Sequence, residues 1–491
     1  MSLLCGWSVM AWACGMRPGR MPSARTRRTS GFSAGNVSRR LSEASPLRCL
    51  YNALLGIVLI LLPQRLCAQA RPFPGTDLQA IYQALIGKID GIPIFDDHAH
   101  SGFSDDPNVD AMTSPPGSSP LRLRETNPEF LQAARALFHY PYSDFSPAHE
   151  AWLLRQTADR PGIAYWDHIL DQCGIETSLA NRVDMPRYLD PKRFRWVFFV
   201  DSFLFPFNNK NFINRNPDEA VYIPLQEKML HRYMQQAALE RLPDTFSNYL
   251  AFITHILEQN KKRGGIAMKF EIAYFRSLNF SDPPRAAAAA IYARYCHGGL
   301  PSPAEYKTFQ DYVFRYLIRE GGRLHLPVNI HTAAVGGDYF SLQKSNVLNL
   351  ENILRDPRYL HTTFVLLHGG YPYDRQAIWL TAMRNVYLDS SEIELLLYPS
   401  EFTRILKQWL EIYPDKVMFG SDAYPYSKII GAEEGYWLGV RSARQSLAWA
   451  LAEMVGNHEI TEVAALKMAH SYLHDTAARL YSPTRDAESS R

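Results

Sequence analysis

Short apolar runs alternate with longer amphipathic stretches through most of the chain. The runs are rich in β-branched and aliphatic residues, and several end in a polar side chain, as buried strands do. Helical patterns such as Arg375–Met383 and Glu401–Ile412 lie between the later runs. The eight runs predicted to be strands are Ile92–Phe95, Thr177–Ala180, Trp196–Val200, Ile266–Phe270, Val328–Ile330, Thr363–Leu367, Asn385–Leu388 and Val417–Phe419.

The alternation of strand and helix predicts the fold class. A strand, a crossover helix and a second strand form the repeating unit of a parallel sheet. Eight such units indicate an α/β protein with a closed (β/α)₈ TIM barrel, in which functional groups lie at the carboxyl ends of the strands. An open doubly wound sheet is the alternative. It needs a glycine-rich phosphate-binding turn after an early strand, and the sequence has none.

The spacing of the runs predicts helical insertions after strands one and three. Residues 101–120 are rich in Ser, Pro, Asp and Gly and predict a long loop, followed by helical patterns around Asn127–Ala136 and His149–Thr157. We expect a helical lid or rim there. The second insertion spans about 201–249, and residues 435–482 predict C-terminal helices that pack on the barrel.

The first seventy residues are typical of an N-terminal extension with a signal peptide. Leu50–Pro63 is apolar but too short to span a membrane, and an arginine-containing segment ending at Arg48 precedes it. An A-x-A pattern closes at Ala70. We therefore expect a signal peptide at about 48–70, cleavage after Ala70, and a secreted or periplasmic domain over 71–491. A signal anchor that is never removed is the alternative.

Composition limits the partners. The 491 residues carry a net charge of +3, but residues 71–491 alone carry −5, which argues against nucleic-acid binding. No apolar run after residue 70 reaches spanning length, so we expect no membrane association after cleavage. The chain has no C-x-x-C pair, and it is open whether Cys173 and Cys296 form a bridge. The expected partner is a small-molecule substrate, and a homo-oligomer stays open.

Candidate chemistry begins at the first predicted strand. The sequence Asp96-Asp97-His98-Ala99-His100 directly follows the first apolar run. Side chains two residues apart on a strand point the same way, so His98 and His100 can both face a barrel interior. Neutral imidazoles are good ligands for zinc and similar divalent metals. A pair with this spacing therefore favours a metal site over two structural histidines.

Other polar residues occur where later strands end. His331 and His368 each close an apolar run, Asp422 follows the last run, and Lys269 lies inside the fourth. Each alone is weak evidence, because a histidine after a strand is often a hydrogen-bonded rim residue. Together they predict a metal ringed by nitrogen and carboxylate ligands, with an open position for water.

The ordered set of D-x-H-x-H on strand one, then Lys, His, His and Asp on strands four, five, six and eight, is similar to the amidohydrolase superfamily. Over about residues 80–480 the chain resembles the amidohydrolase-related branch, which includes a domain fused to glutamine synthetase in some plant and fungal proteins. The stretches that carry this resemblance are His368-Gly369-Gly370-Tyr371-Pro372-Tyr373, Lys269 with Ala273-Tyr274-Phe275-Arg276-Ser277, and Gly420-Ser421-Asp422-Ala423-Tyr424-Pro425.

The resemblance implies roles for the metal-binding candidates. His98, His100 and His331 are implied nitrogen ligands, and Asp422 is implied as a ligand or as the acceptor of a water proton. Lys269 matches a position that is a carbamylated bridging ligand in binuclear members. The implied cofactor is one or two divalent ions, with Zn²⁺ first and Mn²⁺ or Fe²⁺ as alternatives.

The resemblance also implies substrate contacts. His368 binds a second metal if one is present and otherwise contacts the substrate or the transition state. Lys269 without a carbamate can hold a substrate anion, and Arg276 can do so through a bidentate contact. Tyr274 and Tyr371 are weaker pocket candidates.

The function implied is a metal-dependent hydrolase. It uses activated water to cleave an amide, ester or lactone of a small, carboxylate-bearing substrate. A metal-dependent decarboxylase on the same scaffold is the alternative, and sugar-acid isomerisation occurs among distant relatives. A non-enzymatic binding module is a further reading, against which the complete set of six site residues argues.

Overall fold

The computed structural model describes residues 77–110, 120–158, 162–334, 336–427 and 430–482. The backbone contacts divide the chain into units 1–70 and 71–491, and every described residue belongs to the second. The predicted signal peptide and its cleavage position after Ala70 lie outside the described residues, as does part of the predicted 101–120 loop.

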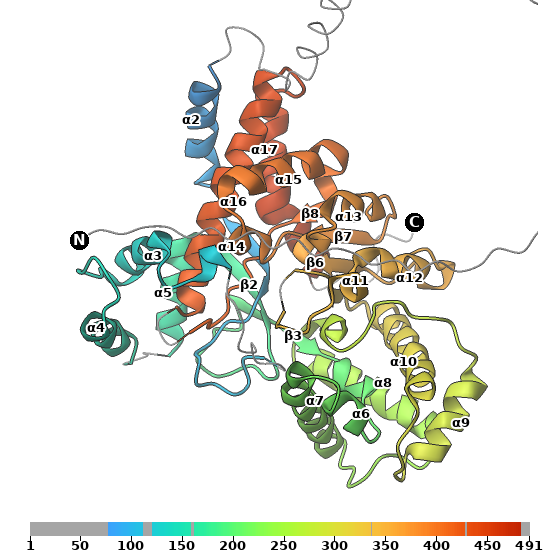
Figure 1. Ribbon diagram of the computed structural model, residues 1–491. Coiled ribbons are helices and arrows are strands. Elements are labelled where there is room, and N and C mark those ends of the chain that lie inside the picture. The colour runs from blue at the N-terminus through green and yellow to red at the C-terminus, as the bar shows by residue number, and fades with distance from the viewer. Residues whose placement is uncertain (1–76, 111–119, 159–161, 335, 428–429, 483–491) are drawn as a thin grey trace, which may run out of the picture. The chain divides into compact units, whose positions relative to one another are not determined.

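Eight parallel strands form one sheet in the order β1 to β8, each paired with its neighbour in sequence. This nearly closed barrel with surrounding helices confirms the predicted α/β TIM-barrel fold (Figure 1). The strands are β1 (Ile94–Ala99), β2 (Ile175–Asn181), β3 (Phe194–Phe199), β4 (Gly265–Phe270), β5 (Val328–His331), β6 (Phe364–Leu367), β7 (Val386–Asp389) and β8 (Val417–Met418).

The barrel closes where β1 meets the segment after β8. Ala99 and Ala423 form a parallel bridge. The backbone N–H of His100 donates to the Ala423 carbonyl at 2.8 Å, and that of Asp422 donates to the His98 carbonyl at 2.7 Å. This closure brings the two ends of the predicted motif set side by side, although they are more than 300 residues apart in sequence.

The first strand differs from its predicted bounds. The apolar run predicted an end at Phe95, but β1 continues to Ala99 and carries two buried aspartates inside the sheet. Asp96 is tolerated there because its carboxylate accepts hydrogen bonds from the Ser421 backbone N–H at 2.7 Å and the Ser178 hydroxyl at 2.9 Å. Polar neighbours across the sheet therefore extend the strand beyond its hydrophobic signal.

The first half of the barrel carries the predicted insertions. Among the described residues, three α-helices lie between β1 and β2, and three lie between β3 and β4. Residues 182–193, which join β2 to β3, contain no helix. The helices up to β5 are α2 (Leu78–Ile89), α3 (Pro128–Phe138), α4 (Pro147–Ala158), α5 (Ile163–Cys173), α6 (Lys210–Ile213), α7 (Pro217–Gln236), α8 (Phe246–Lys262), α9 (Arg285–Tyr295) and α10 (Pro303–Leu324).

The second half is covered by shorter helices and ends in the predicted C-terminal helices. Of these, α16 is 25 residues long and mostly buried, and it packs against α2 and α15. No helix in the described ranges has the length and apolar character needed to cross a membrane. The helices after β5 are α11 (Leu342–Ser345), α12 (Glu351–Leu354), α13 (Asp374–Leu380), α14 (Ile393–Leu396), α15 (Pro399–Ile412), α16 (Ala432–Gly456), α17 (Glu462–His470) and α18 (Thr476–Tyr481).

One layer of the barrel interior is apolar. Tyr481 of α18 packs on this layer, and its hydroxyl donates to the Asn329 side chain at 2.9 Å. The polar side chains lie at the opposite, carboxyl end of the strands. The residues of the apolar layer are Phe95, Leu179, Val197, Ala267, Val365, Leu367 and Met418.

Candidate metal centre

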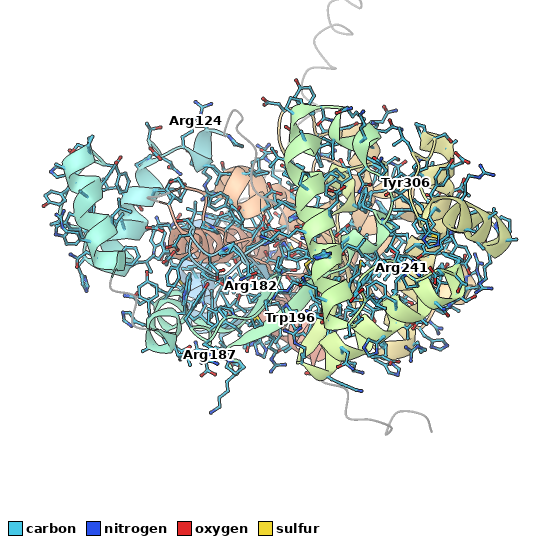
Figure 2. The ribbon with its side chains drawn as sticks, turned by 90° about the horizontal axis from the view of Figure 1, so that it is seen from below. Arg124, Arg182, Arg187, Trp196, Arg241 and Tyr306 are labelled. Atoms are coloured by element: carbon cyan, nitrogen blue, oxygen red, sulfur yellow. The ribbon has the colours of Figure 1, made fainter. Side chains whose placement is uncertain are left out.

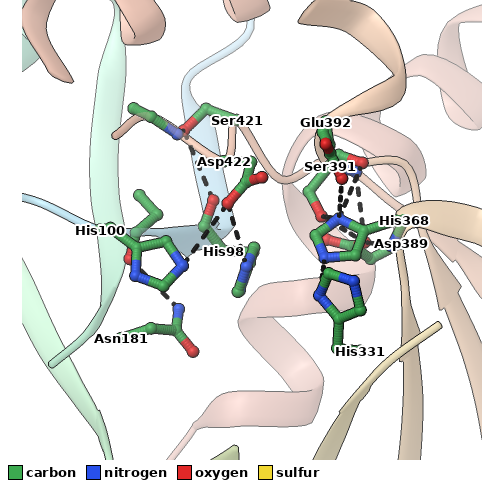
Figure 3. A network of polar contacts seen from close by, with 12 residues as sticks. His98, His100, Asn181, His331, His368, Asp389, Ser391, Glu392, Ser421 and Asp422 are labelled. Carbon is green, nitrogen blue, oxygen red and sulfur yellow. Dashed lines mark hydrogen bonds and ion pairs between the residues drawn. The ribbon is translucent and has the colours of Figure 1, made fainter. Parts of the chain in front are cut away.

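The predicted histidines and Asp422 meet at the carboxyl ends of the strands (Figure 3). His98 lies near the end of β1, His331 ends β5, and His368 follows β6. All three are buried, whereas the Asp422 side chain is 16% exposed. The site is therefore enclosed, with Asp422 as its partly accessible carboxylate.

The closest grouping joins three of these side chains. His98 Nε2 lies 3.2 Å from Asp422 Oδ1, and one potential ligand atom from each of His98, His368 and Asp422 lies within 4.8 Å of the other two. Lys269 Nζ also lies 3.2 Å from His98 Nε2. His98 Nδ1 is buried and has no hydrogen-bond partner among the residues described. Three strands thus direct nitrogen and oxygen ligands into one small volume.

His331 and His368 face each other through lone pairs. His331 Nε2 lies 3.0 Å from the Ala333 carbonyl oxygen, and His368 Nδ1 lies 3.2 Å from that of Ser391. Because a carbonyl oxygen only accepts, each contact places the ring proton on the outer nitrogen. The inner nitrogens, His331 Nδ1 and His368 Nε2, are 2.9 Å apart. Two neutral rings have no proton left for this gap, so the arrangement suits a shared cation.

Burial keeps these imidazoles neutral. It lowers the pKa of His98, His100 and His331 well below the usual value and that of His368 to about 3. The positive charge of Lys269 lowers the His98 pKa further. A neutral imidazole is the form that binds a metal. The protonation states therefore agree with the donor set.

His100 is placed between two carboxylates. Its Nε2 lies 3.6 Å from Asp422 Oδ1, and its Nδ1 lies 3.2 Å from Asp110 Oδ2. His100 is thus close enough to share Asp422 with His98, while its other nitrogen is directed away from that group. His331 contacts the His98–His368–Asp422 group through its Nδ1, which lies beside His368 Nε2.

The backbone is strained at two of these residues. His368 and Asp422 have φ values of 62° and 49°, in the left-handed region that non-glycine residues seldom adopt. Such strain occurs mostly at functional sites. Together with the facing lone pairs of His331 and His368, the donor set fits a divalent ion held by nitrogen and carboxylate ligands.

The structure does not bring Arg276 to this group. Its guanidinium donates to the carboxylate of Asp311 at 2.7 Å and to the Gln310 side chain at 3.2 Å, both on α10. Its other hydrogen bonds go to backbone carbonyls. Arg276 therefore joins the segment after β4 to α10, and its charge pairs with the buried Asp311 carboxylate and not with a substrate.

The two tyrosines lie differently. The Tyr274 ring packs on the His331 imidazole with 4.4 Å between ring centres, so Tyr274 lies beside the candidate site, and its role in a pocket stays a prediction. The Tyr371 side chain is half-buried and packs on the hydrophobic core, while its backbone carbonyl accepts from Ala334. Its part in a pocket stays a prediction.

Asp389 was missed by the sequence analysis. Its Oδ1 accepts hydrogen bonds from the Ser391 hydroxyl and from the His368 backbone N–H, both at 2.7 Å. Burial raises its pKa to about 6, and burial together with the charge of Asp389 raises that of Asp97 well above normal. Asp97 is therefore the protonated partner of the two. Asp389 ends a short apolar run, as His331 does, and this signal could have identified it.

The sequence comparisons find an amidohydrolase pattern in the second half of the chain. Residues 274–482 match the family model described as Amidohydrolase. A stretch of 157 residues is 31% identical to protein fluG of Emericella nidulans. That match covers 32% of this chain and 17% of the relative, so the chain spans much less than the whole of that protein.

The structural comparisons show the same barrel fold. A Lactobacillus casei protein named as a metal-dependent hydrolase is similar with a TM-score of 0.54 and 19% identity, over 81% of this chain and 97% of that one. Glucuronate isomerase of Caulobacter crescentus is similar with a TM-score of 0.57 and 13% identity, over 84% and 96% of the two chains. These findings confirm the resemblance to the amidohydrolase superfamily, whose sequence pattern occupies residues 274–482 and whose fold the described residues share.

Proposed function

We propose that the chain is a metal-dependent hydrolase that cleaves a C–N or C–O bond in a small amide, ester or lactone. The observation that carries the proposal is the facing pair of inner nitrogens on His331 and His368, beside the His98–Asp422 contact. These neutral donors and one accessible carboxylate form the kind of site that hydrolytic metal enzymes use.

The residues that would hold the ion are His98, His368 and Asp422, with His331 directed to the same place through His368. Lys269 and His100 border this group, and their predicted part as ligands stays a proposal. Zn²⁺ suits the nitrogen-rich set, with Mn²⁺ and Fe²⁺ as alternatives. When bound, a divalent ion supplies Lewis acidity that polarises a carbonyl and makes water more acidic.

Asp422 is the residue proposed to move a proton. Its carboxylate is partly exposed, and Oδ1 lies 3.2 Å from His98 Nε2 and 3.6 Å from His100 Nε2. Both rings are neutral, so Asp422 stays available to accept the proton of an attacking water. It can later give that proton to the leaving nitrogen or oxygen.

The remaining groups orient the substrate. The Lys269 ammonium lies at the inner edge of the group, where it can hold a substrate carboxylate. Tyr274 packs on His331 and limits the space above that ring. The predicted carboxylate-bearing substrate therefore relies on Lys269, since Arg276 is bound to Asp311.

Two other reactions use the same kind of donor set. A decarboxylase would release carbon dioxide, and the similarity in fold to a glucuronate isomerase makes sugar-acid isomerisation a further outcome to test. The proposal of hydrolysis rests on the accessible carboxylate beside neutral histidines. Product analysis separates the three reactions, because only hydrolysis adds water across the cleaved bond.

The experiment begins with a chelator-stripped protein and a panel of small amides, esters, lactones and carboxylated aromatics. Addition of Zn²⁺ or Mn²⁺ is expected to restore hydrolysis, with ¹⁸O from labelled water in the product. Asp422→Asn is expected to lower kcat by about 10²–10⁴-fold, while Asp415→Asn at an exposed position before β8 keeps it. Release of carbon dioxide, or turnover unaffected by Asp422→Asn, would reject the proposal.

We also propose that the protein is exported, on the evidence of the apolar segment and the A-x-A pattern before residue 71. Fractionation of the source cells and N-terminal sequencing of the isolated protein test this. A mature N-terminus at Arg71 supports it, and an intact N-terminus in the cell interior rejects it.

A further inference from the structure

A second group of potential ligands lies beside the candidate metal centre. One atom from each of His100, Asp110 and Glu271 lies within 4.8 Å of the other two. His100 follows β1 and Glu271 follows β4, while Asp110 is in the loop after β1. His100 and Glu271 are 5% and 3% exposed, and the Asp110 side chain is 12% exposed. None of these residues belongs to the His98–His368–Asp422 group.

Two buried carboxylate oxygens here lack a hydrogen-bond donor. Glu271 Oε2 and Asp201 Oδ1 have no partner among the described residues, although the Glu271 backbone N–H donates to Asp201 Oδ2 at 2.9 Å. An unpaired buried oxygen costs about 1–3 kcal/mol, and more if it is charged. This group therefore contains buried carboxylate oxygens for which the described residues supply no donor.

The position of His100 shows the same excess of acceptors. Carboxylate oxygens lie near both of its nitrogens, at 3.2 Å from Nδ1 and 3.6 Å from Nε2. A neutral imidazole has one N–H, so only one of the two contacts can be a hydrogen bond. With the N–H on Nε2 and directed to Asp422, Nδ1 presents its lone pair to Asp110, and a cation between these two atoms would stabilise them.

The loop that carries Asp110 is contacted by Arg182, which is labelled in Figure 2. The buried Arg182 guanidinium pairs with Asp106 and donates to the Ser101 carbonyl. The Tyr188 hydroxyl also donates to Asp106, and the Val183 backbone N–H donates to the carbonyl of Asn108. These contacts hold residues 101–108, the segment that leads to Asp110.

We propose that His100 Nδ1, Asp110 and Glu271 form a second divalent-cation site, separate from the group at His98, His368 and Asp422. Two carboxylates and one imidazole suit Mn²⁺ and Zn²⁺. A cation bound there would interact with Glu271 Oε2 and would lie between His100 Nδ1 and Asp110 Oδ2. The proposal does not depend on hydrolysis and survives if the reaction proves to be different.

The test counts Mn²⁺ ions bound by the full chain. Equilibrium dialysis followed by atomic absorption is expected to show that Glu271→Gln binds one Mn²⁺ ion fewer per chain than the native protein. If the ion is still bound, we expect its affinity to be at least tenfold weaker. Asp110→Asn is expected to behave alike. Glu320→Gln is the matched control, because Glu320 is a buried glutamate on α10 that pairs with Arg323. Asp422→Asn should leave this second site occupied.

Anomalous scattering from Mn²⁺-loaded crystals locates the ion. A peak beside the Glu271 carboxylate that disappears in Glu271→Gln, while a peak beside Asp422 persists, supports the proposal. Peaks near Asp422 only, or an unchanged ion count in both variants, overturn it. If Glu271→Gln does not fold, Asp110→Asn decides the matter, because its more exposed side chain lies on a loop.

Discussion

Asp389 supports His368 from behind, through a 2.7 Å hydrogen bond from the His368 backbone N–H to Asp389 Oδ1. The same oxygen accepts from the Ser391 hydroxyl, which lies 2.9 Å from His368 Nδ1. His368 is in the left-handed region, a conformation that costs about 1–3 kcal/mol for such a residue. The carboxylate therefore offsets this strain and fixes the direction of the ring.

We predict that Asp389→Asn weakens metal binding while the barrel stays folded. The amide has less negative charge to hold the His368 peptide and the Ser391 hydroxyl. Loss of support behind a metal-binding histidine typically costs 10–100-fold in affinity. Titration with Zn²⁺ measures this, and circular dichroism checks the fold. Unchanged affinity in Asp389→Asn would show that the contact is only structural.

The sequence predicted the fold well because the barrel strands are apolar. All eight strands were identified, and errors fell at their ends, where polar neighbours such as Ser421 extend β1 past Phe95. The histidines of the candidate site were singled out because each interrupts or follows an apolar run, and their roles stay predictions. Asp389 and Glu271 follow such runs in the same way and could have been identified by the same rule.

Other features of the site have no local signal in the sequence. Asp110 lies in a polar loop, and its approach to His100 is fixed by the distant Arg182. The pairing of Arg276 with Asp311 joins residues 35 positions apart, so the arginine looked free in the sequence. Contacts of this kind depend on the tertiary fold and not on spacing.

We predict that Arg276→Lys affects stability and not substrate binding. Lysine keeps the charge beside the buried Asp311 but loses the fork that also reaches Gln310 and two backbone carbonyls. We expect a loss of about 1–3 kcal/mol in the free energy of unfolding and an unchanged KM. Urea unfolding and steady-state kinetics measure the two. A large rise in KM with unchanged stability would restore the predicted role in substrate binding.

We predict that Gly420→Ala is strongly destabilising. A Cβ at Gly420 would lie 2.4 Å from Asp389 Oδ2 and 2.6 Å from Asp97 Oδ1, inside the carboxyl pair behind the site. The clash should cost about 1–3 kcal/mol and weaken metal binding. Gly87→Ala in helix α2 is the control, because nothing lies within 4 Å of its Cβ, and it should stabilise by about 0.5–1 kcal/mol. Equal melting temperatures for the two variants would contradict the packing described.

We predict that the protein loses stability as the pH rises, partly through Glu434 at the start of α16. Burial and the negative charge of Glu433 raise the pKa of Glu434 to about 8. The folded protein therefore binds more protons than the unfolded chain between about pH 4.3, the usual value for glutamate, and about pH 8. Over that window the free energy of unfolding falls with increasing pH. The contribution of protonated Glu434 to stability is fully present only below about pH 4.3.

Glu434→Gln removes this titration and keeps an oxygen that can accept from the Gly431 backbone N–H. We expect the variant to be more stable than the native protein at pH 8, by roughly 2–4 kcal/mol, and to differ less at pH 5. Urea unfolding at pH 5, 6.5 and 8 measures the difference. Parallel stability curves for the two proteins would mean that Glu434 is already ionised at pH 5, and that Gly431 and nearby donors outweigh its burial beside Glu433.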